Sequence, residues 1–152
     1  MTRRWLTPWR RDAALPAVAP PPQPPTDCGA TTCGPVSGRY AGSTSAAQWL
    51  DCVTEHGLAV CGAATLVVRA DGVLIERVDQ PDVYLPRTAL RGARLDAAIG
   101  GSVYESDGVV VLTWQSGQRL IDTGFRAVPP DEHPAIVAAV QTLTASTVGG
   151  AA

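Results

Sequence analysis

Lysine and asparagine do not occur in the chain, so its basic side chains are arginines and two histidines. Aromatic residues make up only 5% of the composition. No apolar run approaches the roughly 18 residues that a membrane-spanning helix needs. An apolar segment followed by a small-residue cleavage site, which would mark a secretory signal, is also missing. The sequence as given therefore predicts a soluble, cytoplasmic protein.

Motifs for catalysis or cofactor binding are missing too. The sequence contains no Gly-x-Ser-x-Gly elbow, no Walker loop and no dinucleotide fingerprint. Its cysteine pairs, Cys28 with Cys33 and Cys52 with Cys61, have gaps of four and eight residues, whereas zinc sites usually have a two-residue gap. The first pair could close a small loop if oxidised, but cytosolic glutathione would keep it reduced. We interpret the second pair as small apolar residues at a helix edge, and we expect neither a metal nor a cofactor.

Proline content divides the chain at about Val36. The first 36 residues hold eight of the 13 prolines and show no longer apolar periodicity. Polyproline conformation is the expected state of such a stretch, which acts as a semi-rigid spacer. We therefore expect a basic, aromatic tip at 1–12, a disordered Pro-rich linker at 13–36, a folded domain at 37–147 and a disordered tail at 148–152.

Charge divides the chain at the same place. After residue 36, eight arginines face twelve carboxylates, and such a mildly acidic domain would on average repel the phosphates of a nucleic acid. Arginines near an anionic leaflet contribute about 1 kcal/mol each, and tryptophan favours the interface. We therefore predict that the tip contacts an anionic membrane surface or a protein partner through Arg3, Arg4, Trp5, Trp9, Arg10 and Arg11.

Between Ala63 and Arg126, apolar runs alternate with turn dipeptides. Asp71-Gly72 suits a two-residue hairpin, because it tolerates positive backbone angles. The turns at Asp107-Gly108 and Ser116-Gly117 predict that 102–105, 109–115 and 118–126 pair in succession. Together with weaker candidates, the pattern indicates two sheets of three or four short strands, six or seven in all, from eight candidate segments at 39–41, 65–69, 73–78, 83–86, 93–97, 102–105, 109–115 and 118–126.

Two helices are expected beside these strands. Ala46, Trp49, Leu50 and Val53 recur at helical spacing, which predicts a helix ending at Gly57, with Trp49 packed against the sheet. A second helix follows Asp131 and would bury Ile136, Val137, Val140 and Leu143. The predicted fold class is α+β: a partly open antiparallel β-barrel of six or seven strands with a C-terminal α-helix and an extra helix after the first strand.

Several segments between residues 38 and 143 carry a resemblance to a known family. They are Arg39-Tyr40-Ala41-Gly42-Ser43-Thr44, Trp49-Leu50-Asp51, Val73-Leu74-Ile75-Glu76-Arg77, Arg94-Leu95-Asp96 and Asp122-Thr123-Gly124-Phe125-Arg126. In these segments the chain resembles the actinobacterial PH-like (pleckstrin-homology-like) domain family, whose members are often labelled export, transporter or membrane proteins. The resemblance implies the PH-like fold but no established activity.

Members of that family similar to this chain typically begin with a membrane helix, followed by an Arg-rich stretch and a Pro-rich linker. Here Trp9-Arg10-Arg11 and the prolines resemble the last two parts, without the helix. Two alternatives follow: a soluble variant, or a true start upstream of Met1. A helix before Arg3 would place the arginines and the domain in the cytoplasm by the positive-inside rule.

The sequence patterns and the resemblance lead to three hypotheses for function. The leading one is a non-catalytic binding or scaffolding module that takes an unidentified protein or peptide partner, by strand addition at its sheet edge. The second is a homodimeric aspartic-type protease, because Leu120-Ile121-Asp122-Thr123-Gly124 is similar to the motif that carries the shared-proton carboxylates of those enzymes. Phe125 is bulky where that motif usually has a small residue. The third is a structural subunit of a larger assembly.

Overall fold

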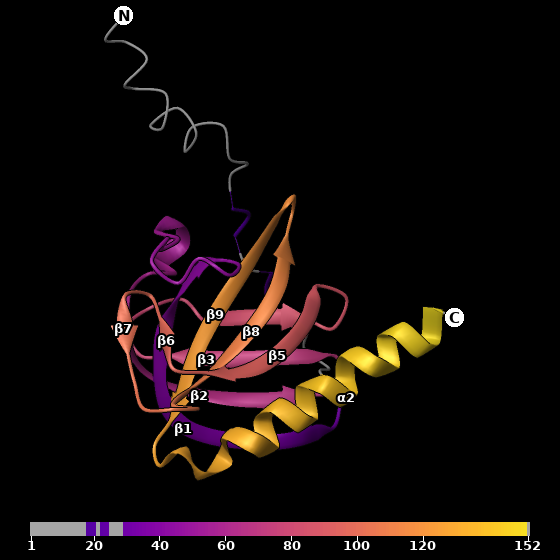
Figure 1. Ribbon diagram of the computed structural model, residues 1–152. Coiled ribbons are helices and arrows are strands. Elements are labelled where there is room, and N and C mark those ends of the chain that lie inside the picture. The colour runs from indigo at the N-terminus through magenta and orange to yellow at the C-terminus, as the bar shows by residue number, and fades with distance from the viewer. Residues whose placement is uncertain (1–17, 21, 25–28, 152) are drawn as a thin grey trace, which may run out of the picture.

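The computed structural model describes residues 18–20, 22–24 and 29–151, with side chains up to residue 145 (Figure 1). The tip and part of the predicted linker lie outside these residues. In chain order the elements are β1 (Thr31–Ser45), η2 (Glu55–Gly57), β2 (Gly62–Arg69), β3 (Gly72–Arg77), β4 (Val83–Pro86), β5 (Leu90–Asp96), β6 (Ala98–Ile99), β7 (Ser102–Val103), β8 (Val109–Ser116), β9 (Arg119–Ala127), η3 (Pro130–Glu132) and α2 (His133–Ala151).

The strands form a seven-stranded antiparallel sheet in the order β4-β3-β2-β1-β9-β8-β5, together with the two-stranded hairpin β6-β7. The large sheet curls without closing, and α2 lies across one end of it (Figure 1). This architecture confirms the predicted α+β class with a partly open antiparallel sheet and one C-terminal helix. The turn pattern suggested two sheets of three or four strands each, whereas the structure has one large sheet and a small hairpin.

Strand β1 joins the two halves of the sheet. Its first part pairs with β2 from Thr31 to Tyr40, and its second part pairs with β9 from Gly38 to Ser45. Strand β9 approaches β1 closely at Gly38, where an added Cβ would clash with the carbonyl oxygen of Arg126. Only glycine fits so close an approach of two backbones.

The described elements extend past two of the boundaries expected from the sequence. Strand β1 begins at Thr31, inside the segment assigned to the Pro-rich linker, because residues 31–36 pair with β2. Helix α2 continues to Ala151, past the expected boundary at 147.

The helix predicted after the first strand is not present. Residues 46–52 instead form a loop, here called the outer loop. Its second residue, Ala47, lies in the left-handed region at φ 63°. The backbone carbonyl of Asp51 closes the loop by accepting a hydrogen bond from the Ser45 amide at 3.0 Å. The Val53 amide donates to the Ser43 carbonyl at 2.9 Å. The backbone of β1 thus provides the hydrogen bonds that a helix would have made internally.

The exposure of the side chains in and just after the outer loop also differs from the prediction. Trp49 and Leu50, expected on the buried stripe, are 40% and 67% exposed, while Val53 is buried. Only one of the three large apolar side chains of the expected stripe therefore reaches the core. The short helix η2 follows, with His56 at a positive φ of 56°.

The predicted pairing of 102–105 with 109–115 is also wrong. Ser102–Val103 forms β7 and pairs with β6, across Gly100 and Gly101 at φ 65° and 84°. Two residues with positive φ give the twist that a two-residue hairpin needs. The longer strand β8 pairs with β5 and β9 instead.

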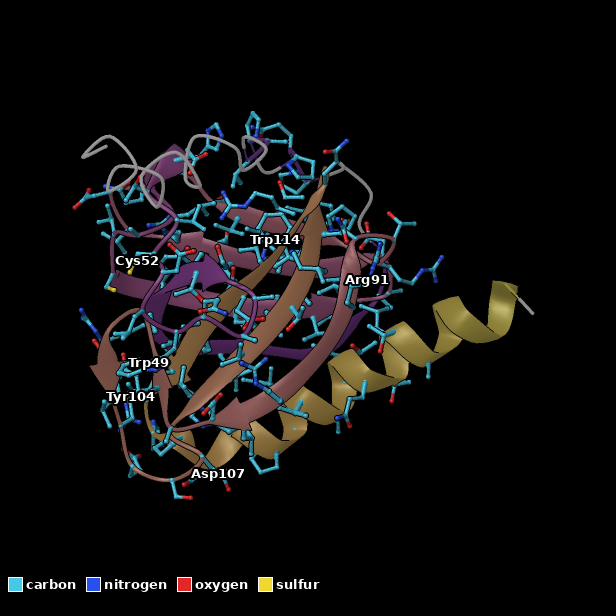
Figure 2. All side chains as sticks on the ribbon, turned by 45° about the horizontal axis from the view of Figure 1, so that its top comes forward. Trp49, Cys52, Arg91, Tyr104, Asp107 and Trp114 are labelled. Carbon is cyan, nitrogen blue, oxygen red and sulfur yellow. The ribbon has the colours of Figure 1, made fainter. Side chains whose placement is uncertain are left out.

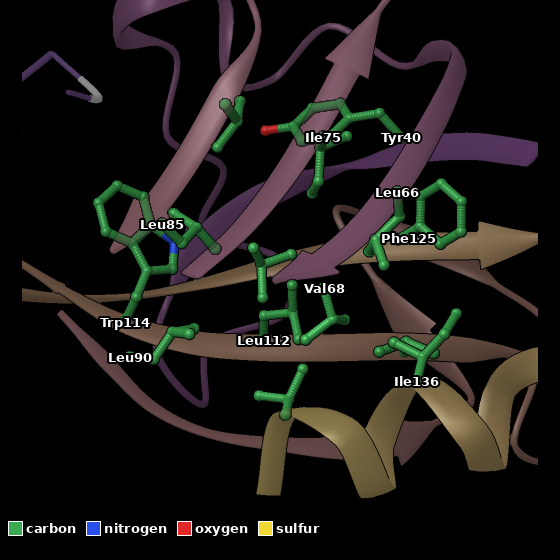
Figure 3. Packing of buried hydrophobic residues seen from close by; sticks show 14 of the residues in the cluster. Tyr40, Leu66, Val68, Ile75, Leu85, Leu90, Leu112, Trp114, Phe125 and Ile136 are labelled. Carbon is green, nitrogen blue, oxygen red and sulfur yellow. The ribbon is translucent and has the colours of Figure 1, made fainter. Parts of the chain in front are cut away.

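The inner face of the curled sheet holds the main apolar core. Ile136, Val140 and Leu143 of α2 are buried against it, as predicted, while Val137 is only partly buried; Trp114 is 2% exposed. Figure 3 shows Ile136 below Leu66, Leu112 and Phe125. The sheet and α2 therefore enclose a single continuous core.

Val18 packs against a second part of this core, while Ala19 and Pro20 are exposed. Val18 is 3% exposed, its amide donates to Glu55 Oε2 at 3.2 Å, and its carbonyl lies 2.7 Å from His56 Nε2. The Ala19 amide donates to Ser116 Oγ at 3.1 Å. These contacts hold Val18 and Ala19 beside η2 and the β8-β9 turn.

Tyr40 and Arg77 form a buried polar contact in this core. The Tyr40 hydroxyl donates to the Leu58 carbonyl at 2.6 Å, and the Arg77 guanidinium lies 4.0 Å from the ring centroid. Arg77 Nη2 donates to the carbonyls of Gly57 and Val60 at 2.8 and 2.7 Å. Burial, only partly offset by Ser43 and Arg77, raises the pKa of Tyr40 from 10.0 to about 12.

This raised pKa predicts a loss of stability in alkali. Because the folded state favours the protonated phenol, its contribution is complete below pH 10 and is lost as pH rises from 10 to about 12. Urea unfolding across this range should show the loss in the native chain, and Tyr40→Phe should lack it. The Phe variant should also be less stable by about 1 kcal/mol at neutral pH, because it loses the bond to Leu58.

The matched control is Tyr104→Phe, which removes a phenol but leaves that of Tyr40 in place. Urea unfolding of this control should show the same loss of stability between pH 10 and about 12 as the native chain. An undiminished loss in Tyr40→Phe would contradict the assignment.

Candidate ligand site on the outer face of the sheet

The outer face of the sheet, away from the main core, is partly covered. Along β9, Ile121, Thr123 and Phe125 face the core, so Asp122 and Gly124 face the other way. The β6-β7 hairpin packs on this face, where Ile99 joins a small apolar cluster with Ala41, Val109 and Val111. The outer loop reaches the same hairpin, since the Gly101 amide donates to the Trp49 carbonyl at 3.1 Å.

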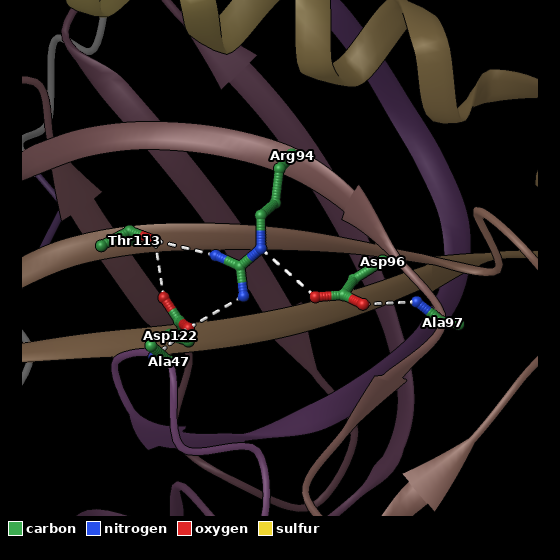
Figure 4. A network of polar contacts seen from close by, with 6 residues as sticks. All are labelled: Ala47, Arg94, Asp96, Ala97, Thr113 and Asp122. Carbon is green, nitrogen blue, oxygen red and sulfur yellow. Dashed lines mark hydrogen bonds and ion pairs between the residues drawn. The ribbon is translucent and has the colours of Figure 1, made fainter.

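Polar side chains form a row across four neighbouring strands of this face. Thr44 of β1 is the register partner of Asp122 on β9, and Asp122 is the partner of Thr113 on β8. Arg94 reaches the row from β5, which borders β8. Figure 4 shows Arg94 between Asp122 and Asp96. The antiparallel register thus brings together residues that are distant in the sequence.

Asp122 lies at the centre of the row and is only 2% exposed. Its Oδ1 accepts from the Thr113 hydroxyl at 2.6 Å, and its Oδ2 accepts from the Ala47 amide at 3.0 Å and from Arg94 Nη2 at 3.1 Å. A buried carboxylate is stable as an anion when a cation and further donors surround it in this way. Asp122 therefore acts as a structural counter-ion that holds the outer loop to the sheet.

This geometry contradicts the aspartic-protease hypothesis. Such enzymes need two carboxylates that share a proton and face the substrate. Asp122 instead lies within a strand, paired with Arg94 and covered by the backbone of Ala47. Its Thr-Gly neighbours are therefore part of a strand, not of a catalytic turn.

Arg94 also contacts a second carboxylate. Its Nε donates to Asp96 Oδ2 at 3.3 Å, while Asp96 Oδ1 accepts from the Ala97 amide at 2.7 Å. Partial burial alone would lower the pKa of Arg94, but the hydrogen bonds and charges of Asp122 and Asp96 raise it above its ordinary value. The guanidinium is thus a permanent cation held between two anions.

A pocket of about 570 Å³ opens above this row. Thr44 borders it and is fully buried, yet its Oγ1 has no hydrogen-bond partner among the described residues. Trp49 forms another part of the lining and is 40% exposed. A buried hydroxyl without a partner is unfavourable for the fold. The remaining lining comes from Ala47, Arg94, Asp96, Ala98, Ile99 and Asp122.

Other residues singled out from the sequence lie elsewhere. The predicted tip contacts, Arg3, Arg4, Trp5, Trp9, Arg10 and Arg11, and also Cys28, lie outside the described residues.

The described cysteines do not form a site. Cys52 and Cys61 are exposed, and the helix edge where we expected them does not exist, while Cys33 is partly buried. All three are free thiols, and burial, with a contribution from Glu132, raises the pKa of Cys33. Within the described ranges no group of three or more His, Cys, Asp or Glu side chains could hold a metal ion.

Sequence reasoning missed Thr44, Thr113 and Arg94 as site residues. The available signal was Asp122 itself, a charged residue inside an otherwise apolar strand pattern.

Comparison with known proteins gives a family for the chain as a whole. A family model described as bacterial PH domain-like matches residues 18–141. No curated protein matches the chain.

The ion pair predicts a specific pattern of stability changes. Arg94→Met leaves the buried Asp122 charge without its cation, so the free energy of unfolding should fall by roughly 2 kcal/mol. Adding Asp122→Asn should restore part of this loss, because the charge is removed while the amide oxygen can still accept from the Ala47 amide and the amide NH2 can donate to the Thr113 hydroxyl. Urea unfolding of both single variants and the double variant measures the coupling.

Arg91→Met is the matched control, since exposed Arg91 on the same strand donates only to the nearby carbonyls of Thr88 and Leu90. It should change stability by less than about 0.5 kcal/mol. Equal losses in Arg91→Met and Arg94→Met would show that the pair with Asp122 has no special role.

Proposed function

Because the chain belongs to the bacterial PH domain-like family, we propose that it is a non-catalytic binding module whose ligand site is the pocket on the outer face. PH-like domains are generally non-catalytic, which fits the buried, ion-paired state of Asp122. The observation that carries the proposal is the unpartnered, buried hydroxyl of Thr44 at a pocket that also exposes Trp49.

Strand addition at a sheet edge, the binding mode expected from the sequence, has less support from the two edges. Strand β4 has four residues and ends at Pro86, which lacks an amide donor. On β5, the Ala93 carbonyl already accepts from Gln141 of α2 at 3.5 Å. Neither edge therefore presents a long free row of backbone groups, whereas the outer-face pocket is open.

The tip gives the module a second point of attachment in this proposal. We infer that Arg3, Arg4, Trp5, Trp9, Arg10 and Arg11 hold the domain at the cytoplasmic side of an anionic membrane. Four arginines and two tryptophans suit weak, reversible adsorption. The fixed contacts of Val18 with Glu55 and His56 support this, because they would keep the domain close to the point where the tip adsorbs. Among the described helices, none has the length and apolar character needed to cross a bilayer.

Substitution of Trp49 tests the pocket as the partner site. A tagged chain purified from its own cells should retain a partner, and Trp49→Ser should lower the recovered amount at least about tenfold, in line with loss of a buried aromatic contact. Quantitative mass spectrometry of the bound proteins measures this ratio.

Val78→Ser is the matched control, since Val78 is a 60% exposed apolar residue outside the pocket lining. It should leave recovery unchanged. A partner that is retained equally by both variants binds elsewhere, and the pocket would then lose its assigned role.

Liposome flotation tests the tether. The full chain should float with vesicles rich in phosphatidylserine, and a variant with Arg3, Arg4, Arg10 and Arg11 changed to glutamine should not, because about 1 kcal/mol is lost per arginine. Binding of the native chain should weaken steeply with added salt. Equal flotation of both proteins, or flotation with neutral vesicles, would remove the tether from the proposal.

A further inference from the structure

We propose that the outer-face pocket binds a cationic side chain, a guanidinium or an ammonium group, presented by a protein segment. This inference rests on the proposed function, since it names the chemistry of the ligand at the same site. It comes from the charges, the unused hydrogen-bond acceptors and the exposed indole of the pocket.

The charge of the lining favours a cation. Asp96 and Asp122 face a single guanidinium, that of Arg94, so the charged groups of the lining sum to about one negative charge. Both carboxylates contact Arg94, which leaves little positive charge free for an anionic ligand. An anion in the pocket would meet a net repulsion, whereas a cation would complete the balance.

The hydrogen-bonding groups favour a ligand rich in donors. Thr44 Oγ1 has no hydrogen-bond partner among the described residues. Among the same residues, Asp122 Oδ1 accepts a hydrogen bond only from the Thr113 hydroxyl. Each carboxylate oxygen has capacity for a further bond, and a hydroxyl oxygen accepts as well. A guanidinium carries five N–H donors and an ammonium three, so either can satisfy several of these acceptors together.

Trp49 provides the apolar part of the site. Its indole borders the pocket and is 40% exposed, and its backbone is held by the Gly101 amide. Figure 2 shows Trp49 and Tyr104 on the side of the molecule opposite the free end of α2. A cation over an indole face is attracted by the ring quadrupole, most strongly for tryptophan. The pocket thus combines an aromatic wall with an acidic floor.

Titration with small probes tests the proposal on the full chain. N-acetyl-arginine amide is the cationic probe, and N-acetyl-citrulline amide is its uncharged counterpart of nearly the same shape. NMR should show shifts at the amides of Ala47 and Gly101 and at the Trp49 indole, with a Kd for the arginine probe on the order of 1 mM, ordinary for so small a ligand. The citrulline probe should bind at least about tenfold more weakly, because it lacks the charge.

Two matched variants localise the effect. Asp96→Asn keeps an acceptor for the Ala97 amide but removes one negative charge of the lining, so the arginine probe should bind about fivefold more weakly. Asp131→Asn removes an exposed negative charge outside the lining and should leave the Kd unchanged. Equal binding of the arginine and citrulline probes, or equal effects of the two variants, would overturn the proposal.

The cation could come from another protein or from the chain's own tip, and one further arm separates these sources. If the tip supplies it, changing Arg3, Arg4, Arg10 and Arg11 to glutamine should tighten binding of the arginine probe by removing a competitor. If another protein supplies it, the Kd should stay the same. Both results support cation binding in the pocket.

The probe experiment and the capture experiment can fail separately. No probe shifts, together with a partner that Trp49→Ser no longer retains, would reject the cationic ligand and leave the binding module in place. Probe shifts without any retained partner would support the cation site and reject the proposed partner site.

Discussion

The rest of the structure depends on the continuity of β1 from Thr31 to Ser45. One strand that pairs with β2 along its first part and with β9 along its second makes a single sheet of two halves that would otherwise have no hydrogen-bonded connection among the described strands. The change of partner requires the close backbone approach at Gly38 and a register shift between Tyr40 and Gly42, where φ is 102°. Residues beyond this bend are thereby brought beside β9.

Beyond that bend, the two faces of the sheet carry different kinds of side chain. The inner face is mostly apolar, apart from buried groups such as Tyr40 and Arg77, and α2 and Val18 pack against different parts of its core. The outer face receives Thr44, which the register places beside Asp122, and the polar row continues from there to β5. A binding site can therefore occupy the outer face without disturbing the apolar packing that stabilises the domain.

Local patterns in the sequence predicted the parts of this fold that local interactions determine. The hairpin near Asp71 and the apolar stripe of α2 depend on neighbours within a few residues, and both form, although the hairpin turn lies at residues 70–71 and Gly72 is the first residue of β3, one position from the predicted Asp71-Gly72 turn. The outer loop was not predictable in this way, because its hydrogen bonds go to the backbone of β1 and their energy outweighs a weak helical periodicity. The site was missed for the same reason, since Arg94 and Asp122 are 28 residues apart and meet only through the order of the strands.

The polar row is better explained by recognition than by stability. A buried ion pair often contributes no more to stability than well-packed apolar residues of similar volume, because both charges must be removed from water. The pair of Arg94 with Asp122 is joined by Thr44, whose buried hydroxyl lacks a partner in the described chain and so weakens the fold further. In the proposed function, the row is a preorganised surface whose remaining acceptors are satisfied when a ligand binds.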